Sequence, residues 1–265
     1  MCDTCGCGQP GTPAKITRPG EEHSHDHSHG HGHSYDHDHS HDHDHGTQRL
    51  ISVQEDLLGK NRLLASRNSG YFEARGILAL NIMSSPGSGK TTLLEQTIRL
   101  LKDRKAVAVI EGDQQTLNDA KRIEAAGAPA VQVNTGNACH LDAEMIMNAV
   151  KKLDPVQGSL LFIENVGNLI CPSLFDLGEN YRVVMFSTTE GEDKPLKYPT
   201  MFAGARLCII SKMDLLPHLE FDLEKAKAFA SRVNPELQFI ELSSLSGEGM
   251  EDWITWILDK CGQTD

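Results

Sequence analysis

Residues Ile77–Thr92 read I-L-A-L-N-I-M-S-S-P-G-S-G-K-T-T. The first part, Ile77–Met83, is an almost continuous apolar run, as in strands that are buried on both faces of a parallel sheet. The second part, Ser84–Thr91, matches the phosphate-binding loop that joins such a strand to a helix, with Ser84 in place of the usual first glycine. The alternative is an ordinary glycine-serine turn, but Gly-Lys-Thr-Thr directly after a buried strand rarely arises by accident. The run therefore predicts a nucleoside triphosphate site.

Each residue type in this loop has an expected role. The glycines let backbone N–H groups turn towards phosphate oxygens, and the following helix directs its N-terminus at the anion. The Lys90 ammonium would reach the β- and γ-phosphates, and the Thr91 hydroxyl would bind Mg²⁺. The predicted nucleotide contacts are Ser85, Gly87, Ser88, Gly89, Lys90, Thr91 and Thr92.

Beyond the loop, short apolar runs alternate with helical patterns up to the C-terminus. The further predicted strands are Ala106–Ile110, Ala130–Val133, Leu160–Ile163, Val183–Phe186, Leu207–Ile210 and Phe239–Leu242. The predicted helices are Lys90–Leu101, Leu117–Ala126, Leu141–Leu153, Leu223–Val233 and Met250–Asp259. This alternation predicts an α/β fold of the P-loop NTPase class, with a doubly wound, mostly parallel sheet that binds ligands beyond the carboxyl ends of its strands.

Composition divides the chain into two parts. Residues 1–46 hold three cysteines and eleven histidines but almost no large apolar side chains. Such a segment cannot bury enough surface to offset the entropy of ordering, so we expect a disordered metal-binding tail. Residues 47–265 form one nucleotide-binding domain, which opens with an amphipathic helix that ends near Asn68–Gly70. The residues expected on the apolar face of this helix are Leu50, Val53, Leu57 and Leu64.

The net charge excludes several classes of partner. The chain has 25 lysines and arginines against 37 aspartates and glutamates, a formal charge of −12. Nucleic acids and anionic membranes are bound through clustered cations, so we expect neither as a partner. No apolar run approaches the roughly 18 residues of a membrane span, and residues 1–20 contain no signal-peptide core. These features predict a cytoplasmic protein.

Acidic side chains follow two of the predicted strands. Asp113 follows the second strand, and Glu164 follows the fourth. Since Mg²⁺ prefers oxygen ligands, both carboxylates are predicted to bind it, and Glu111 is a weaker candidate. Glu164 with Gly167 also resembles the Asp-x-x-Gly element of GTPases. The alternative is that these acids only mark strand ends. The predicted catalytic residues are Lys90, Asp113 and Glu164.

A later segment predicts the base of the nucleotide. Ser211-Lys212-Met213-Asp214 resembles the Asn-Lys-x-Asp element with which GTPases recognise guanine, with Ser211 in place of asparagine. The carboxylate would accept the guanine N1 and N2 hydrogens, which adenine cannot supply. The serine-rich run at 243–247 resembles the fifth GTPase element. We therefore predict GTP and GDP as ligands, although the Ser211–Asp214 segment alone could be an ordinary helix N-terminus. The predicted base contacts are Lys212, Asp214 and Ser243.

The N-terminal part carries two groups of metal-ligand residues. The thiolates of Cys2, Cys5 and Cys7 can bind one soft or borderline metal ion. A disulfide is the alternative, but it is disfavoured in a reducing cytosol. The imidazoles that follow suit nickel, zinc and copper, so the tract alone does not name the metal. An affinity tag is the alternative, against which the interleaved Asp, Ser and Gly residues argue. The histidines of the tract are His23, His25, His27, His29, His31, His33, His37, His39, His41, His43 and His45.

A second cysteine and histidine group lies inside the domain. Cys139 and His140 are adjacent just before a predicted helix, and Cys171 follows Glu164 by seven residues. A loop can let the adjacent Cys139 and His140 side chains both reach one ion, whereas the alternative is a small buried cysteine and a capping histidine. Cys208 lies within an apolar strand and is predicted to be a core residue.

These motifs together resemble the HypB family, the nickel-insertion GTPases of [NiFe]-hydrogenase maturation. The resemblance includes the Cys-x-x-Cys-Gly-Cys start and extends from about Leu50 to the C-terminus. The runs that carry it are Ser84–Thr92, Ile110–Thr116, Cys139–Asp142, Phe162–Glu179, Glu190–Pro199 and Ser246–Met250.

The resemblance implies GTP hydrolysis coupled to nickel delivery. It implies a metal site of Cys139, His140 and, in some members, Cys171, close to nucleotide-responsive loops. The N-terminal cysteines would form a separate, tighter nickel site, with zinc as a second candidate metal, and the histidine tract implies nickel storage. The implied partners are a second copy of the chain, favoured by GTP and metal, a HypA-like zinc and nickel accessory protein, and the hydrogenase large-subunit precursor.

Three other functions stay open on the sequence. The first is a nickel or zinc storage protein with a regulatory nucleotide site. The second is a small-molecule kinase, although no arginine cluster follows the phosphate-binding loop. The third is a metallochaperone for another nickel enzyme, such as urease.

Overall fold

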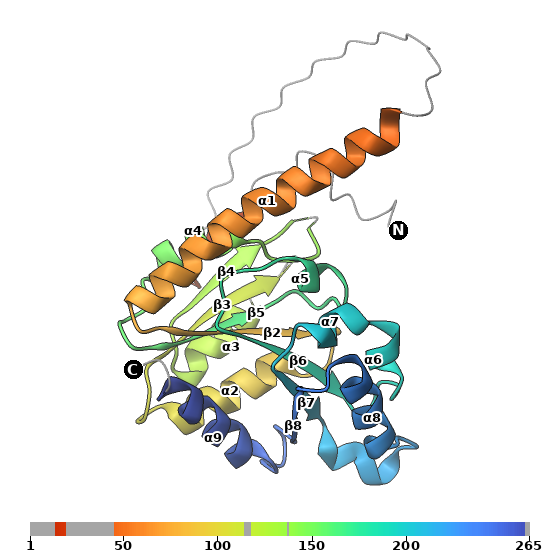
Figure 1. The fold of residues 1–265 in the computed structure, drawn as a ribbon. Helices are drawn as coiled ribbons and strands as arrows, with labels where there is room; N and C mark the ends of the chain where they lie inside the picture. The colour runs from red at the N-terminus through yellow and green to blue at the C-terminus, as the bar shows by residue number, and fades with distance from the viewer. Residues whose placement is uncertain (1–13, 20–44, 114–117, 137, 263–265) are drawn as a thin grey trace, which may run out of the picture.

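The computed structural model describes residues 14–19, 45–113, 118–136 and 138–262 of the 265-residue chain. Within these residues, eight strands form one sheet in the order β1-β4-β3-β5-β2-β6-β7-β8 (Figure 1). The strands are β1 (Lys15–Thr17), β2 (Leu78–Ser84), β3 (Val107–Asp113), β4 (Ala130–Asn134), β5 (Leu160–Glu164), β6 (Tyr181–Ser187), β7 (Leu207–Ser211) and β8 (Gln238–Glu241).

The predicted fold class is confirmed by the strand pairing. Strands β2 to β8 pair in parallel, and β1 pairs antiparallel with β4. The chain leaves β2 towards β3 on one side and later returns to place β6 on the other, so β2 lies between β5 and β6. The carboxyl end of β2 is therefore the point where the winding reverses, which is the place where ligands bind in open α/β sheets.

Helices cover both faces of this sheet (Figure 1). Leu80 and Ile82 of β2 point to the face covered by α2, α3 and α9, whereas Ala79 and Met83 point to the face covered by α1, α4, α7 and α8. No helix in the described residues is long and apolar enough to cross a membrane. The helices are α1 (His45–Ala74), α2 (Lys90–Leu101), α3 (Asn118–Ala126), α4 (Ala143–Leu153), α5 (Cys171–Leu174), α6 (Lys194–Lys197), α7 (Pro199–Ala203), α8 (Leu223–Val233), α9 (Met250–Cys261) and the 3₁₀ helix η1 (Met213–His218).

The predicted elements agree closely with those observed. Each predicted strand is present with its ends displaced by at most a few residues, and α2 and α8 begin and end at the predicted residues. The short helices α5, α6, α7 and η1 were not predicted, because four to six residues are too few to show a helical period.

The N-terminal part differs from the expected disordered tail at two places. Lys15–Thr17 form β1, and α1 begins at His45, before the predicted domain boundary. Ile16 packs against the buried cluster beneath α1 and α4, and its carbonyl accepts a hydrogen bond from Lys152 Nζ at 3.1 Å. A composition averaged over the whole tail conceals so short an edge strand. The division at residue 46 itself stays a prediction.

The prediction for the inward face of α1 was wrong at Leu57, whereas Leu64 is half-buried and the side chains of Leu50 and Val53 lie outside the described part of the chain. Leu57 is 52% exposed, and the residues that face the body in this part of the helix are Asn61, Ala65, Asn68 and Phe72. Asn61 Nδ2 donates to the Asp176 carbonyl at 2.8 Å, and Asn68 Nδ2 donates to the carbonyls of residues 143 and 177. The hydropathy pattern misleads here because these asparagines are buried through hydrogen bonds to backbone carbonyls.

Candidate functional site

The phosphate-binding loop lies between β2 and α2, at the carboxyl end of the central strand. Gly87 and Gly89 have positive φ values of 76° and 98°, a conformation that glycine adopts without strain. Lys90 Nζ donates to Ser84 Oγ at 2.8 Å, and Ser88 Oγ donates to the same oxygen at 2.6 Å. The serine at the unusual first position thus holds the lysine inside the loop.

A cavity of about 550 Å³ opens beside this loop. Its walls come from the loop, the ends of β3 and β5, and the start of α3. The charged residues that line it are Lys90, Glu111, Asp113, Asp119, Arg122 and Glu164. Four acids and two bases give this lining a formal charge of −2 when all six groups are ionised, a balance that favours a cation beside the phosphates.

Two buried carboxyl groups lie at the base of this cavity. Glu111 of β3 is the register partner of Glu164 of β5, and Thr91 Oγ1 donates to Glu164 Oε1 at 2.9 Å. Burial raises the pKa of both carboxyls, and the neighbouring Glu164 raises that of Glu111 further. Glu111 Oε1 and Glu164 Oε2 are buried without a hydrogen-bond partner. Unpaired carboxyl oxygens beside a threonine hydroxyl fit a magnesium ion.

The predicted base-recognition residues converge at the ends of β7 and β8. Ser243 Oγ donates to Asp214 Oδ1 at 2.5 Å and accepts hydrogen bonds from two backbone N–H groups of its own loop, so the carboxylate is held in place. Ser211 Oγ donates to the Ser88 carbonyl of the phosphate-binding loop at 2.8 Å. The serine that replaces asparagine therefore connects the base loop to the phosphate loop. The Lys212 carbonyl accepts from Thr188 Oγ1 at 2.9 Å.

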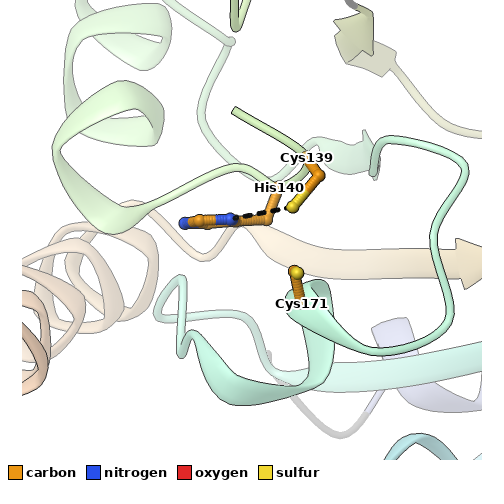
Figure 2. Close-up of side chains that lie close together, drawn as sticks. All are labelled: Cys139, His140 and Cys171. Carbon is orange, nitrogen blue, oxygen red and sulfur yellow. Dashed lines mark hydrogen bonds between the residues drawn. The ribbon is translucent and has the colours of Figure 1, made fainter. Parts of the chain in front are cut away.

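Cys139, His140 and Cys171 come together in space, with their ligand atoms all within 4.8 Å of one another (Figure 2). Cys139 Sγ lies 4.0 Å from His140 Nδ1. The imidazole stacks on the Phe175 ring, with 3.9 Å between centroids and an interplanar angle of 17°. Burial lowers the pKa of His140, although the Asp142 carboxylate opposes this shift. The neutral ring and two thiols form a donor set that suits nickel or zinc.

A short segment joins this trio to the nucleotide cavity. Glu164 is at one end and Cys171 at the other, and between them Gly167 lies directly on the phosphate-binding loop. A Cβ atom at Gly167 would lie 3.1 Å from the Cα and Cγ atoms of Pro86. Any movement of the phosphate-binding loop at Pro86 therefore meets the segment that carries Cys171.

The remaining predicted ligands have different outcomes. Cys2, Cys5, Cys7 and the histidines from His23 to His43 lie outside the described residues, and His45 begins α1. Cys208 is fully buried in β7, which confirms that it is a core residue.

The comparison with protein families agrees with this geometry. The model described as "CobW/HypB/UreG, nucleotide-binding domain" matches residues 78–241. The Escherichia coli K12 protein named hydrogenase maturation factor HypB is 58% identical over 210 residues, which are 79% of this chain and 72% of that protein. The chain belongs to the HypB family. The Azotobacter vinelandii HypB is 57% identical over 209 residues, covering 79% of this chain and 69% of that protein.

Solved HypB structures share the fold. The HypB structure from Archaeoglobus fulgidus superposes with a TM-score of 0.72 at 43% identity, covering 77% of this chain and 100% of that one. A HypB structure from Helicobacter pylori, described as a complex with nickel, has a TM-score of 0.72 at 41% identity and covers 77% of this chain and 96% of that one.

Two charged residues of the cavity in this HypB-family chain were not predicted from the sequence. Asp119 and Arg122 lie on α3 and pair with each other at 3.0 Å, and Arg122 also bonds Glu95 and the Thr92 hydroxyl. An acid and a base three residues apart on a helix are usually a surface pair, so no local signal marked them as cavity residues.

Proposed function

We propose that this HypB-family chain is a GTP-hydrolysing nickel metallochaperone that stores nickel and delivers it to the large subunit of a [NiFe]-hydrogenase. One observation carries the proposal. The segment Glu164–Cys171 begins with a residue that lines the cavity beside the phosphate-binding loop and ends with a member of the Cys139, His140 and Cys171 trio. The nickel complex described for the Helicobacter pylori relative and the hydrogenase maturation names of the curated relatives support it.

The phosphate chemistry in this proposal depends mainly on positioning and charge. Lys90 leaves Ser84 to contact the β- and γ-phosphates, and the loop N–H groups stabilise the charge that develops on the γ-phosphate as water attacks. Thr91, Asp113 and Glu164 would hold Mg²⁺, which would neutralise part of the phosphate charge. GTP hydrolysis then removes the contacts that the γ-phosphate makes with the segment after β5.

Nickel is the cargo, and the trio binds it through two thiolates and a neutral imidazole. In a background in which Cys2, Cys5 and Cys7 are serine, thiolate-to-nickel charge-transfer absorption should report on this trio, because Cys208 and Cys261 are buried core residues. We expect Cys139→Ser to reduce that absorption, since only the Cys171 thiolate remains, and to weaken binding by more than the about 10–100-fold that an outer-shell partner costs. Titration against chelator-buffered free nickel measures it.

Cys261→Ser is the matched control, since it removes one thiol from α9 on the opposite face of the sheet. Its spectrum and affinity should equal those of the background protein. Equal nickel affinity in the Cys139→Ser protein would remove the trio from the proposal.

The histidine tract is proposed as the nickel store. Deletion of residues 23–45 should remove most bound nickel at saturation and leave the GTP hydrolysis rate unchanged, because the described residues that line the proposed nucleotide site all come from later in the chain. Equilibrium dialysis measures the bound nickel. A control chain with these histidines replaced by asparagine keeps the acids and should lose as much nickel. An unchanged stoichiometry in either chain would contradict the storage role.

The proposed partners follow from the same function. They are a second copy of the chain, favoured by GTP and metal, a HypA-like accessory protein, and the hydrogenase large-subunit precursor in the cytoplasm. Ile170 and Leu174, which flank Cys171, are 48% and 52% exposed and give the metal trio an apolar border suited to a protein partner.

A second client is favoured by one comparison. The Helicobacter hepaticus protein named hydrogenase/urease maturation factor HypB is 46% identical over 184 residues, covering 68% of this chain and 75% of that protein. Delivery to urease is therefore the alternative. It would use the same two sites, and transfer of nickel to each purified apo-enzyme distinguishes the two clients.

A further inference from the structure

Strand β2 contains a buried amide that the nucleotide and metal sites do not explain. Asn81 is fully buried in the middle of an otherwise apolar run between two parallel strands. A buried amide at such a position is costly unless all its polar atoms are paired. Both polar atoms of the Asn81 side chain have partners. The oxygen accepts from Asn165, which leads towards His140, and the nitrogen donates to Glu179, which leads towards Cys171.

The first partner leads from β2 to His140. Asn165, which directly follows Glu164, donates from Nδ2 to Asn81 Oδ1 at 3.2 Å and is 1% exposed. Its own Oδ1 accepts from the Leu141 N–H at 3.3 Å and from the Val166 N–H at 3.0 Å. One side chain therefore binds the residue next to His140 and the segment that enters the nucleotide cavity.

The second partner leads from β2 to the other side of the trio. Asn81 Nδ2 donates to Glu179 Oε1 at 3.0 Å, and Arg182 Nε donates to the same oxygen at 2.7 Å. The Glu179 side chain is 2% exposed and that of Arg182 is 20% exposed, so the carboxylate end of this ion pair is buried. The Arg182 guanidinium also donates to the Ser173 carbonyl at 3.2 Å, within the helix that begins with Cys171.

The two branches close into a ring. Arg182 Nη2 donates to the Phe175 carbonyl at 3.4 Å, and the Phe175 ring is the one that stacks on His140. Since His140 is bonded covalently to Leu141, the ring returns to Asn165. The ring members are Asn81, Asn165, Leu141, His140, Phe175, Arg182 and Glu179. Hydrogen-bond networks that are largely buried restrain the arrangement of their members.

From this ring we propose that Asn81 is the positioning residue through which the nucleotide state sets the geometry, and hence the nickel affinity, of the Cys139, His140 and Cys171 site. The inference rests on the proposed function. A displacement of Asn165 on loss of the γ-phosphate is passed by its amide to Leu141 on one side and, through Asn81 and Glu179, to Arg182 and the Cys171 helix on the other. A ligand can shift such an equilibrium only through contacts that differ between two states.

The test is the ratio of nickel dissociation constants in the presence of GDP and of a non-hydrolysable GTP analogue. It uses the full chain with Cys2, Cys5 and Cys7 replaced by serine, and chelator-buffered nickel, and it follows the thiolate-to-nickel absorption so that nickel on the histidine tract does not contribute to the signal. The unaltered site should give a ratio that differs from one by at least about fivefold, as is usual for coupled sites. In Asn81→Ala the ratio should fall at least about twofold towards one, because the branch from Asn165 through Asn81 and Glu179 to Arg182 is cut while the bond from Leu141 to Asn165 stays.

Thr97→Val is the matched control. Thr97 is fully buried and accepts a hydrogen bond from Trp253 Nε1 at 2.9 Å on the face opposite the trio, so the variant loses a buried hydrogen bond without touching the ring. It should keep the full ratio. If Asn81→Ala fails to fold by circular dichroism, Asn165→Asp serves instead, because it keeps the oxygen that accepts from Leu141 and removes the donor to Asn81.

The outcomes separate this inference from the function on which it rests. A ratio of one in the unaltered site overturns the coupled metallochaperone and the inference with it. A wild-type ratio that persists in folded Asn81→Ala or Asn165→Asp overturns the inference alone. A loss of ratio in Thr97→Val as well would show that any core weakening uncouples the sites, and would overturn the specific role of Asn81.

Discussion

Replacement of Lys90 by alanine should lower the GTP hydrolysis rate by about 10²–10³-fold, the loss seen when one charge-stabilising donor is removed from a preorganised site. Lys90 is 8% exposed and its ammonium lies at the centre of the loop on Ser84, so no neighbouring cation can replace it there. Arg122, the other base of the cavity, is already bonded to Glu95, Asp119 and Thr92. Phosphate release at saturating GTP and magnesium measures the effect.

Lys102→Ala is the control, because Lys102 is the exposed residue that follows the same helix α2 at its far end. It changes the net charge of the protein equally and should hydrolyse GTP at the unaltered rate. GDP affinity, measured in parallel, separates lost binding from lost chemistry. A Lys90→Ala protein with the wild-type hydrolysis rate would exclude this loop as the catalytic site.

Replacement of Asp214 by alanine should reduce the preference for guanine over adenine nucleotides by about 10²–10⁴-fold. Hydrogen bonds to charged groups contribute about 1.5–3 kcal/mol each, and the carboxylate would accept two from guanine. Tenfold in affinity corresponds to about 1.4 kcal/mol, so two such bonds give a factor of this size. Competition between GDP and ADP for a fluorescent nucleotide measures the preference.

Ser243→Ala should show a smaller loss in the same measurement, because the carboxylate remains but its 2.5 Å hydrogen bond is removed. Glu220→Ala, which removes an exposed carboxylate shortly after η1, should keep the full preference. If Asp214→Ala still binds GDP over ADP as strongly as the unaltered chain, guanine is recognised elsewhere.

The positions of the candidate nucleotide residues could be predicted because each lies close to the end of a strand in the sequence, and because the carboxyl ends of parallel strands lie at the same edge of a sheet. Lys90, Asp113, Glu164 and Asp214 all follow or end strands, and parallel strands end at one edge. The closeness of Cys139 and Cys171 was predicted instead from the resemblance to the HypB family, and the structure brings their ligand atoms within 4.8 Å of one another and of His140. Predicting the positions of Lys90, Asp113, Glu164 and Asp214 needed only the order of strands and loops, which the apolar runs and the glycines of the sequence indicate directly.

The parts that could not be predicted depend on contacts between distant residues. Asn61 and Asn68 look like surface residues of a helix, yet their amides bond carbonyls more than a hundred positions away as well as nearer ones. Asn81 looks like an imperfection in a strand until its partners at 165 and 179 are known. The hydropathy pattern of a sequence indicates whether a side chain faces water or the core, but it does not indicate which polar group a buried side chain will bond.

The antiparallel pairing of β1 with β4 limits the distance between the N-terminal thiols and the end of β4. Lys15 pairs with Asn134, so the chain before it departs from the end of β4 at which the loop towards Cys139 starts. Cys7 precedes Lys15 by eight residues, and a chain of that length spans at most about 28 Å even when fully stretched. A metal ion bound by Cys7, as the sequence predicts, would be kept within about 28 Å of that strand end for as long as it stays bound. Its local concentration there exceeds what diffusion between separate molecules would provide.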